Sequence, residues 1–339
     1  MTRFGRAVAG EPMAVPPVWM MRQAGRYQRS YQALRAKHSF EALCRTPELA
    51  AAVTLAPIVE FDFDAAILFS DLLFPLEALG FGLSYEAGPP ALDGRLTLDR
   101  VHAFRPVAEA LARLTFQRDA MAATRAALPV DRALLGFVGG PWTLFVYAME
   151  GTHAGALARS KAAPGLYRAF ADRLVPLLIE NIRIQFDGGA DVVMIFDTAA
   201  GEVSPGMFAA QIAPDLAALA RAFPRRLGYY AKGSHPAQVP PIAGAPWAGL
   251  GFDARWDLAD VLATRPAPGF VQGNFDPALL LLDRGELADA LAAFLAPIAR
   301  LDVTARRGWV CGLGHGVLPG TPEDHVRRFV GTVREVCQA

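Results

Sequence analysis

Short apolar runs that end at a polar or glycine-rich turn recur along the 339-residue chain. We interpret these runs as strands. They are Pro17–Met21, Ala65–Phe69, Leu134–Val138, Asp191–Phe196, Leu227–Ala231, Trp247–Phe252, Phe270–Gln272 and Trp309–Leu313. Between them lie segments whose apolar residues recur at helical spacing. Helices are therefore expected at Pro47–Phe61, Ala103–Ala127, Tyr167–Gly188, Met207–Ala222, Leu258–Leu262, Glu286–Leu295 and Pro322–Cys337.

This alternation of strands and helices predicts an α/β protein with a parallel sheet. No Pro/Ser-rich linker or change of composition divides the chain, so residues 1–339 are expected to form a single (β/α)8 barrel domain of the TIM type. In such barrels the active site lies at the carboxyl ends of the strands. Here those ends carry polar side chains, namely Arg22, Asp71, Thr198, Asp253 and His315.

One uncharged stretch, Ala133–Met149, approaches the length of a membrane span. Its middle reads Gly139-Gly140-Pro141, which would interrupt a membrane helix. A strand, a turn and a helix that begins at Pro141 account for the same residues. We therefore expect no membrane span.

Composition narrows the possible functions. The 33 basic and 33 acidic side chains balance, which argues against nucleic-acid binding. With 53% hydrophobic and 19% charged residues, the chain can bury a large core and is not disordered. The three cysteines, Cys44, Cys311 and Cys337, are too far apart for a disulfide framework or a cysteine-rich zinc site. No secretory signal is visible, so a reducing, cytoplasmic location is expected.

The sequence shows no motif that binds a cofactor. Glycine-rich phosphate-binding loops are missing, which argues against a nucleotide cofactor. The histidines show no pairing at metal-ligand spacing. We therefore expect neither a metal nor an organic cofactor.

Arg22 and Arg26 are spaced one helical turn apart after the first expected strand. Both guanidinium groups could face one ligand, and Gly25 between them would permit close approach of a backbone. This pattern suits an anion with several carboxylates. A solvated helix face with surface salt bridges fits the spacing as well, although the position at a strand end favours a ligand.

Four other side chains have a structural and a functional interpretation. Asp71 follows an apolar run, where its carboxylate needs a partner, and it could cap the next helix instead. Thr198 could cap a helix in the same way. Tyr147 lies one helical turn after Thr143 and could simply pack in the core. His315, flanked by Gly314 and Gly316, could be neutral or charged at physiological pH.

Several motifs resemble those of the uroporphyrinogen decarboxylase family, over nearly the whole chain. They are PVWMMRQAGRY at residues 17–27, FSD at 69–71, GFVGGPWTL at 136–144 with Tyr147 and Glu150-Gly151, QGNFDP at 272–277 and LGHG at 313–316. The resemblance implies a single-domain barrel that forms a homodimer. It also implies conversion of uroporphyrinogen to coproporphyrinogen, by removal of four acetate carboxyl groups without a metal or organic cofactor.

Site residues follow from the resemblance. Asp71 corresponds to the central carboxylate that accepts hydrogen bonds from pyrrole N–H groups, and Arg22 is a candidate proton donor. The implied substrate-binding residues are Arg22, Gln23, Ala24, Gly25, Arg26, Asp71, Tyr147, Thr198 and His315. The chain departs from the family pattern at residues 28–31, at Gly312 in place of asparagine, and at Ala254-Arg255 in place of Trp-Thr.

Two alternatives remain at this point. Some barrels of the same superfamily transfer methyl groups from corrinoids to thiols with a zinc site of His and Cys, but no suitable cysteine pair is visible here. A non-catalytic tetrapyrrole-binding protein would need the arginines but not the central carboxylate of Asp71.

Overall fold

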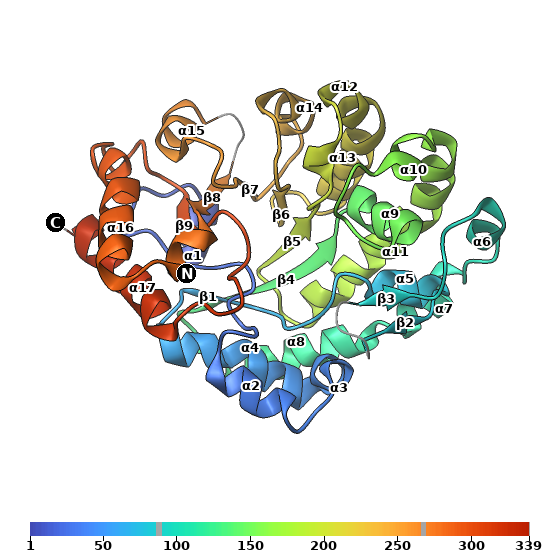
Figure 1. Cartoon of the computed structure of the whole chain (residues 1–339), viewed down its shortest axis with the longest axis horizontal. Helices are drawn as coiled ribbons and strands as arrows, with labels where there is room; N and C mark the ends of the chain where they lie inside the picture. Colours follow the sequence, from blue (N-terminus) through green and yellow to red (C-terminus); the bar gives the residue numbers. More distant parts are fainter. Residues whose placement is uncertain (86–89, 266–268, 339) are drawn as a thin grey trace.

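The computed structural model describes residues 1–85, 90–265 and 269–338. Its main sheet has seven strands, and their order in space follows their order along the chain. They are β1 (Ala65–Ile67), β4 (Ala133–Gly139), β5 (Val192–Phe196), β6 (Leu227–Tyr230), β7 (Gly249–Gly251), β8 (Phe270–Phe275) and β9 (Trp309–Leu313). All neighbouring strands are parallel. Helices surround the curled sheet (Figure 1), which confirms the predicted fold class.

The segment Pro17–Trp19 lies between β9 and β1, where a closed barrel needs an eighth strand. On the β9 side, the Trp19 N–H donates to the carbonyl of Cys311 over 3.0 Å, and the Cys311 N–H donates to the first carbonyl of the segment over 2.9 Å. On the β1 side, the Asp64 N–H donates to the Val18 carbonyl over 2.9 Å. The segment therefore joins the two edges of the sheet.

The expectation of a regular first strand at Pro17–Met21 is wrong, because only Val18 forms a β-bridge. The Val18 N–H donates to a carboxylate oxygen of Asp64 over 2.8 Å, so a side chain replaces the backbone acceptor of a strand. The junction of Pro17–Trp19 with β9 and β1, called the seam below, brings the backbones close together. A Cβ atom at Gly312 would lie 2.0 Å from the Trp19 carbonyl oxygen, so asparagine could not take the place of Gly312 in this structure.

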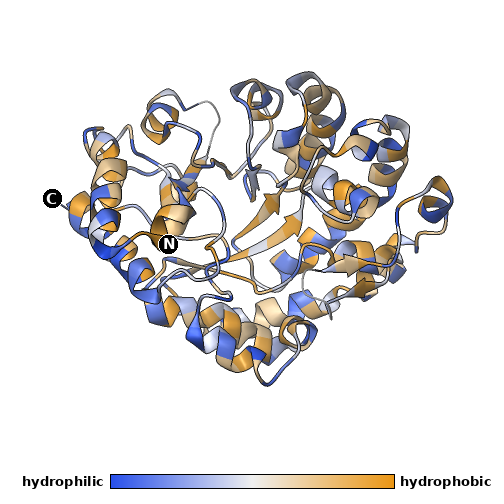
Figure 2. Ribbon diagram, viewed as in Figure 1, coloured by the Kyte–Doolittle hydropathy of each residue, from blue (hydrophilic) through white to orange (hydrophobic). Residues whose placement is uncertain are grey.

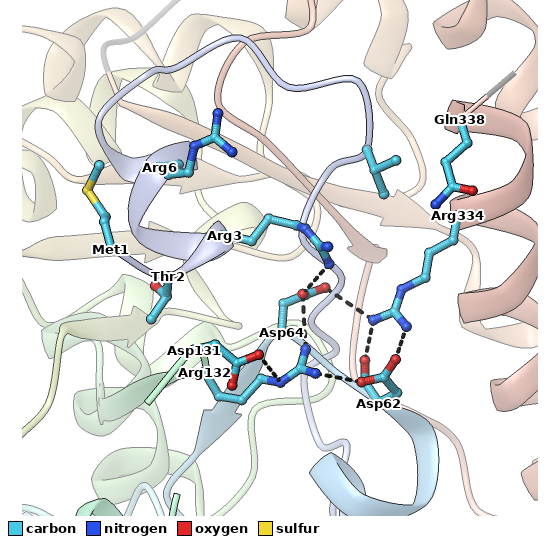
Figure 3. Close-up of a pocket in the computed structure, with 11 residues that line it drawn as sticks. Met1, Thr2, Arg3, Arg6, Asp62, Asp64, Asp131, Arg132, Arg334 and Gln338 are labelled. Carbon is cyan, nitrogen blue, oxygen red and sulfur yellow. Dashed lines mark hydrogen bonds and ion pairs between the residues drawn. The ribbon is translucent and has the colours of Figure 1, made fainter. Parts of the chain in front are cut away.

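An ion-pair network secures the same seam at the amino ends of the strands (Figure 3). The Asp64 side chain is 2% exposed and lies 2.6 Å from Arg3, 3.2 Å from Arg132 and 3.6 Å from Arg334. Asp62 pairs with Arg132 over 2.7 Å and also with Arg334. Asp64 and Arg132 immediately precede β1 and β4, so this network lies at the end of the barrel opposite the expected active site.

We expect Asp64→Asn to lower the free energy of unfolding by about 1–2 kcal/mol, because it removes the charge that three arginines share. The arginines are partly exposed and can turn toward water, which limits the loss. Asp131→Asn is the matched control, since Asp131 is 68% exposed and lies 3.6 Å from Arg132. Urea unfolding of both variants measures the difference; equal stabilities would show that the network does not hold the seam.

The helices that the sequence predicts lie close to their expected positions. They are α4 (Pro47–Phe61), α8 (Thr115–Ala127), α9 (Pro141–Glu150), α11 (Pro164–Asp187), α13 (Ala213–Ala222), α15 (Leu258–Thr264), α16 (Arg284–Ala299) and α17 (Glu323–Gln338). The expected helix Ala103–Ala127 is divided at Arg113-Leu114 into α7 (Val107–Ala112) and α8. Within Met207–Ala222, a π-helical turn at Phe208–Ile212 precedes α13.

The apolar pattern misses several short elements. They are α1 (Arg3–Val8), α2 (Arg29–Arg35), α3 (Phe40–Arg45), α5 (Phe74–Leu79), α6 (Leu98–His102), α10 (Ala158–Lys161), α12 (Pro205–Met207), α14 (Pro240–Ala243) and the hairpin of β2 (Leu83–Ser84) with β3 (Ala91–Leu92). The uncharged stretch forms β4, a turn and the start of α9, as expected. None of the described helices is long and apolar enough to cross a membrane.

Alternate strand residues fill the barrel interior, while the outer strand faces pack against the helices. The strands at the centre of the sheet are mainly hydrophobic (Figure 2). The interior cluster includes Leu135 of β4, Met194 of β5 and Val310 of β9. Helix α1 adds Phe4, which packs against Phe270 with ring centroids 5.6 Å apart. These side chains fill the barrel interior. Outside them, at the amino end, the ion-pair network lines a pocket of about 460 Å³, whereas the predicted site residues follow the carboxyl ends of the strands.

Candidate active site

The predicted site residues follow the strands at the carboxyl end of the barrel. Asp71 lies four residues after β1, Thr198 lies two after β5 and His315 lies two after β9. Arg22 follows the closing segment Pro17–Trp19. Because the carboxyl ends of parallel strands share one edge of a sheet, these residues lie at one rim, as predicted.

The loop of Arg22 and Arg26 is built from turns rather than from the expected helical turn, and helix α2 begins only at Arg29. Buried Gln23 holds the loop, because its amide donates to the carbonyl of Ala65 over 2.9 Å. The Tyr27 hydroxyl donates to the Gln23 carbonyl over 2.6 Å. Gln23 is fully buried and therefore supports the loop from inside.

Arg22 is exposed and adopts the left-handed backbone conformation, with φ 55°. A residue other than glycine occupies this region at a cost of about 1–2 kcal/mol. Its side chain packs over Gly316, where a Cβ atom would lie 2.5 Å from the Arg22 Cδ. Within the described residues, neither the Arg22 nor the Arg26 guanidinium forms an ion pair or a side-chain hydrogen bond. Both charges are therefore free for an anionic ligand.

Asp71 is partly exposed, yet protein surrounds its carboxylate closely. Burial raises the pKa of Asp71 to about 6, against the opposing effects of a hydrogen bond and the Arg22 charge. Its Oδ1 accepts from the Leu73 N–H over 2.7 Å, in the turn before α5. No other hydrogen bond to the carboxylate is seen among the described residues, so Oδ2 can accept one from a ligand.

The Tyr147 hydroxyl lies 2.6 Å from Nδ1 of His153, a residue that the sequence did not single out. Burial and then the charge of Asp71 raise the pKa of Tyr147 to about 12, so the phenol stays protonated at neutral pH. Burial, Arg22 and Lys232 lower the pKa of His153. The charges of Asp71 and Arg22 both act on the half-buried Tyr147, which is therefore not simply a core residue.

His315 is half-buried beside Tyr230, another residue that the sequence did not single out. The Tyr230 hydroxyl donates to the Gly314 carbonyl over 2.7 Å and lies 3.1 Å from Nδ1 of His315. Because the hydroxyl proton is already used, Nδ1 must carry the proton of this second bond, which leaves Nε2 as an acceptor. Burial, then the charges of Arg22 and Lys232, lower the pKa of His315 to about 3, so the imidazole is neutral.

Aromatic rings form a floor inside the barrel mouth. The ring centroid of Phe137 lies 5.7 Å from that of Phe196, and the centroid of Phe196 lies 6.3 Å from that of Tyr230. The Tyr230 ring in turn stacks on His315, with centroids 6.0 Å apart. Phe137 and Phe196 are half-exposed at the ends of β4 and β5. This floor presents apolar surface next to the charged groups.

Thr198 is half-buried, and the helix that follows it, α12, is capped by Ser204 and not by Thr198. Its neighbour Asp197 bonds the preceding helix α9 instead. The fully buried Asp197 accepts from the N–H and the hydroxyl of Thr143, over 2.8 and 2.6 Å, in the first turn of α9. Burial raises the pKa of Asp197 to about 6. A Cβ atom at Gly140 would lie 2.3 Å from the Asp197 carboxyl carbon. Asp197 therefore positions α9, and through it Tyr147.

The electrostatic couplings show which predicted residues share one site. The charge of Arg22 acts on Asp71, Tyr147 and His315. The charge of Arg26 instead acts on Tyr31 of α2. Arg22 thus acts on three of the predicted site residues, whereas Arg26 acts on a residue of α2.

Ala24 and Gly25, the remaining predicted loop residues, are both half-exposed. A Cβ atom at Gly25 would meet nothing closer than the Arg22 carbonyl oxygen, at 3.5 Å. The fold itself therefore does not require glycine at this position, which leaves close approach of a ligand as the reason we expect for it.

Across residues 1–85, 90–265 and 269–338, no cluster of three or more His, Cys, Asp or Glu side chains is placed to hold a metal ion. The buried Asp253 is engaged by the backbone, since it accepts from the Arg255 N–H over 3.0 Å and from the Gly233 N–H.

Comparison with known proteins agrees with this geometry. The family model "Uroporphyrinogen decarboxylase (URO-D)" matches residues 1–336. The uroporphyrinogen decarboxylase of Gloeobacter violaceus is 34% identical, over 97% of this chain and 96% of that protein. The enzyme of the same name from Anaeromyxobacter sp. is 38% identical, over 98% of this chain and 97% of that protein.

Solved structures share the fold at lower identity. A methyltransferase from Methanosarcina mazei superposes with a TM-score of 0.78 at 21% identity, covering 98% of this chain and 97% of that one. A B12-independent methionine synthase from Shewanella sp. W3-18-1 gives a TM-score of 0.55 at 11% identity, with 96% of each chain covered. At these identities the likeness concerns the fold alone.

Proposed function

Because this chain belongs to the uroporphyrinogen decarboxylase family, we propose that it converts the four acetate side chains of uroporphyrinogen III to methyl groups, giving coproporphyrinogen III. The observation that carries the proposal is the placement of Asp71. Its carboxylate has one oxygen without a hydrogen bond among the described residues, and the Arg22 charge stabilises its ionised form. It lies at the rim of a barrel mouth that has an aromatic floor. Such a site suits a flat apolar ring system that carries many carboxylates.

The substrate supplies its own electron sink. Protonation of a pyrrole carbon next to the acetate turns the ring into a cation, and the electron pair of the breaking C–C bond flows into that cation as CO₂ leaves. A proton then adds to the exocyclic carbon, and the ring carbon loses its proton. The net change for each acetate is the gain of one proton and the loss of one CO₂, so no cofactor is needed.

Asp71 stabilises the cation. In this account the free Oδ2 accepts hydrogen bonds from pyrrole N–H groups, whose positive charge grows as the ring is protonated. A preorganised anion beside a developing cation lowers the barrier more than it strengthens binding of the neutral ring. The raised pKa of Asp71, about 6, still leaves the carboxylate ionised at neutral pH.

Arg22 and Arg26 hold acetate and propionate carboxylates, and Arg22 is our candidate for the proton donor. A guanidinium binds a carboxylate through two parallel N–H groups, which orients the group as well as attracting it. Both side chains are exposed and unpaired within the described residues, so binding breaks no existing ion pair.

The remaining predicted residues complete the binding site. Tyr147, Thr198 and His315 offer two hydroxyls and a ring nitrogen around the aromatic floor, and the backbone of Gln23, Ala24 and Gly25 borders Arg22. We assign them to orienting one pyrrole ring at a time, which makes the reaction effectively intramolecular.

The test is anaerobic incubation of the purified, metal-stripped protein with uroporphyrinogen III, followed by oxidation and chromatography by carboxyl number. Porphyrins with seven to four carboxyl groups support the proposal. Tight binding without conversion would instead support a tetrapyrrole carrier. If the substrate neither binds nor reacts, transfer of a corrinoid methyl group to a thiol is the next assay.

The homodimer, the cytoplasmic location and the lack of nucleic-acid binding remain predictions. Sedimentation of the purified protein tests the first of them.

A further inference from the structure

His153 lies in the loop that follows helix α9, two residues beyond the Gly151 that ends the helix in a left-handed conformation. The residues on either side of it, Thr152 and Ala154, are exposed, whereas the His153 ring is half-buried. The ring turns toward Tyr147, with centroids 5.3 Å apart and Nδ1 2.6 Å from the hydroxyl oxygen. A loop residue thus contacts a side chain of the candidate site.

Three cations, Arg22, Lys232 and Arg95, and the neutral His315 act on this pair or lie near it. Arg22 from the loop after the closing segment and Lys232 after β6 both act on His153, and His315 after β9 is coupled to it. The Arg95 guanidinium lies beside Gly151, 2.5 Å from where a Cβ atom would stand. The His153 side chain therefore faces cations on the side that a polycarboxylate would approach.

We propose that His153 is a positioning residue that sets the direction of the Tyr147 hydrogen bond and takes up a proton when a polycarboxylate binds. This inference rests on the proposed function and deepens it. It assigns to the same site a group that makes substrate affinity depend on pH.

The direction of the hydrogen bond follows from the number of protons. A phenol has one proton, so a Tyr147 that donates to an unprotonated Nδ1 can only accept from the substrate. When Nδ1 carries a proton, His153 donates to Tyr147, and the phenol proton is free for a substrate carboxylate. A protonated imidazole has only donors and therefore enforces this second arrangement.

The pH dependence has a defined sign. In the empty site, burial and two nearby cations lower the pKa of His153 below its usual 6.5. Bound carboxylates offset those cations, so the pKa of His153 is higher in the complex. A group whose pKa rises on binding takes up a proton, and affinity then falls as pH rises through that range. The KM for uroporphyrinogen III is expected to increase between about pH 5.5 and 7.5, around the usual pKa of histidine.

Two substitutions separate the direction of the Tyr147 hydrogen bond from the uptake of a proton by His153. His153→Gln keeps an N–H that can donate to Tyr147 but cannot take up a proton, and His153→Phe removes both properties. His102→Gln is the matched control, because His102 is exposed at the end of α6. The measurement is KM for uroporphyrinogen III from about pH 5.5 to 8, expressed as the ratio of variant to wild type. In this ratio of KM values, the effects of groups that titrate in both proteins, such as Asp71, cancel.

For His153→Gln the KM ratio should be about fivefold near pH 5.5 and approach one near pH 8, the loss expected for one partly exposed charge interaction. For His153→Phe it should be about fivefold or more at every pH, because the hydrogen bond is lost as well. A His153→Gln ratio that does not change with pH would overturn the inference. Thermal unfolding midpoints equal to wild type show that the loop substitution leaves the fold intact. A wild type that does not decarboxylate uroporphyrinogen would instead refute the proposed function.

Discussion

Asp71→Asn is expected to lower kcat by about 10²- to 10³-fold, the usual effect of removing one preorganised electrostatic group from a transition state. Asparagine has the same shape, and its carbonyl oxygen can still accept from the Leu73 N–H, which lies 2.7 Å from Oδ1 of Asp71. What is lost is the negative charge next to the protonated ring. KM should change less than kcat, because the cation exists only after protonation.

The pH profile gives this prediction a second readout. Because the pKa of Asp71 is raised from 3.8 to about 6, kcat/KM of the wild type should fall as pH decreases through about 6. Asp71→Asn has no ionisable group there, so its residual activity should lack this decrease. Rates measured from about pH 5 to 8 compare the two profiles, around the raised pKa of the carboxyl group.

Stability should move in the opposite direction from activity. A carboxyl group whose pKa is raised in the folded state binds protons more tightly there, so stability decreases as pH rises from 3.8 to about 6 and stays lower above. Asp71→Asn removes this cost and should be at least as stable as wild type at neutral pH. Asp289→Asn, on the exposed face of α16, serves as the control for stability.

Unchanged kcat in a folded Asp71→Asn protein would refute the role of Asp71.

Arg22→Ala is expected to lower kcat/KM by about 10²- to 10³-fold, the loss seen when one partner of a desolvated charge pair is truncated. Arg22→Lys keeps the charge but loses the planar guanidinium, so it should recover only part of the activity. Arg113→Ala, at the exposed end of α7, is the matched control and should retain wild-type rates.

Removal of the Arg22 charge should also shift two titrations upward. Arg22 lowers the pKa of Asp71 and that of His315. In Arg22→Ala the acid limb of kcat/KM should therefore move to higher pH, whereas in Arg22→Lys it should stay near the wild-type position. Identical acid limbs in all three proteins would show that Arg22 does not lie beside the catalytic carboxylate.

Much of the fold could be predicted because strands buried on both faces leave continuous apolar runs. Helix α4 has the predicted bounds Pro47–Phe61. The first strand could not be predicted correctly, since its pairing depends on the distant Asp64 carboxylate that takes the Val18 N–H. The break between α7 and α8 has a local cause instead: the Thr115 hydroxyl donates to the Ala112 carbonyl over 3.2 Å, which competes with helical pairing.

The site was predictable where a polar residue lies within a few residues of the carboxyl end of a strand, as Asp71 and His315 do. Tyr230 was harder, because LGYYAKG places two tyrosines side by side and only strand register decides which faces inward. Tyr230 joins the interior cluster, while Tyr229 packs outside against Trp247 with ring centroids 5.7 Å apart. His153 gave no signal of its own, because its contact with Tyr147 depends on how the chain turns at the end of α9.

The most direct test of the central claim uses uroporphyrinogen III labelled with ¹³C in its acetate carboxyl groups. The account predicts that the purified, metal-stripped protein releases four equivalents of labelled CO₂ per tetrapyrrole, while substrate labelled in the propionate carboxyls releases none. No labelled CO₂ from a folded protein that binds the substrate, or release from the propionates, would contradict it.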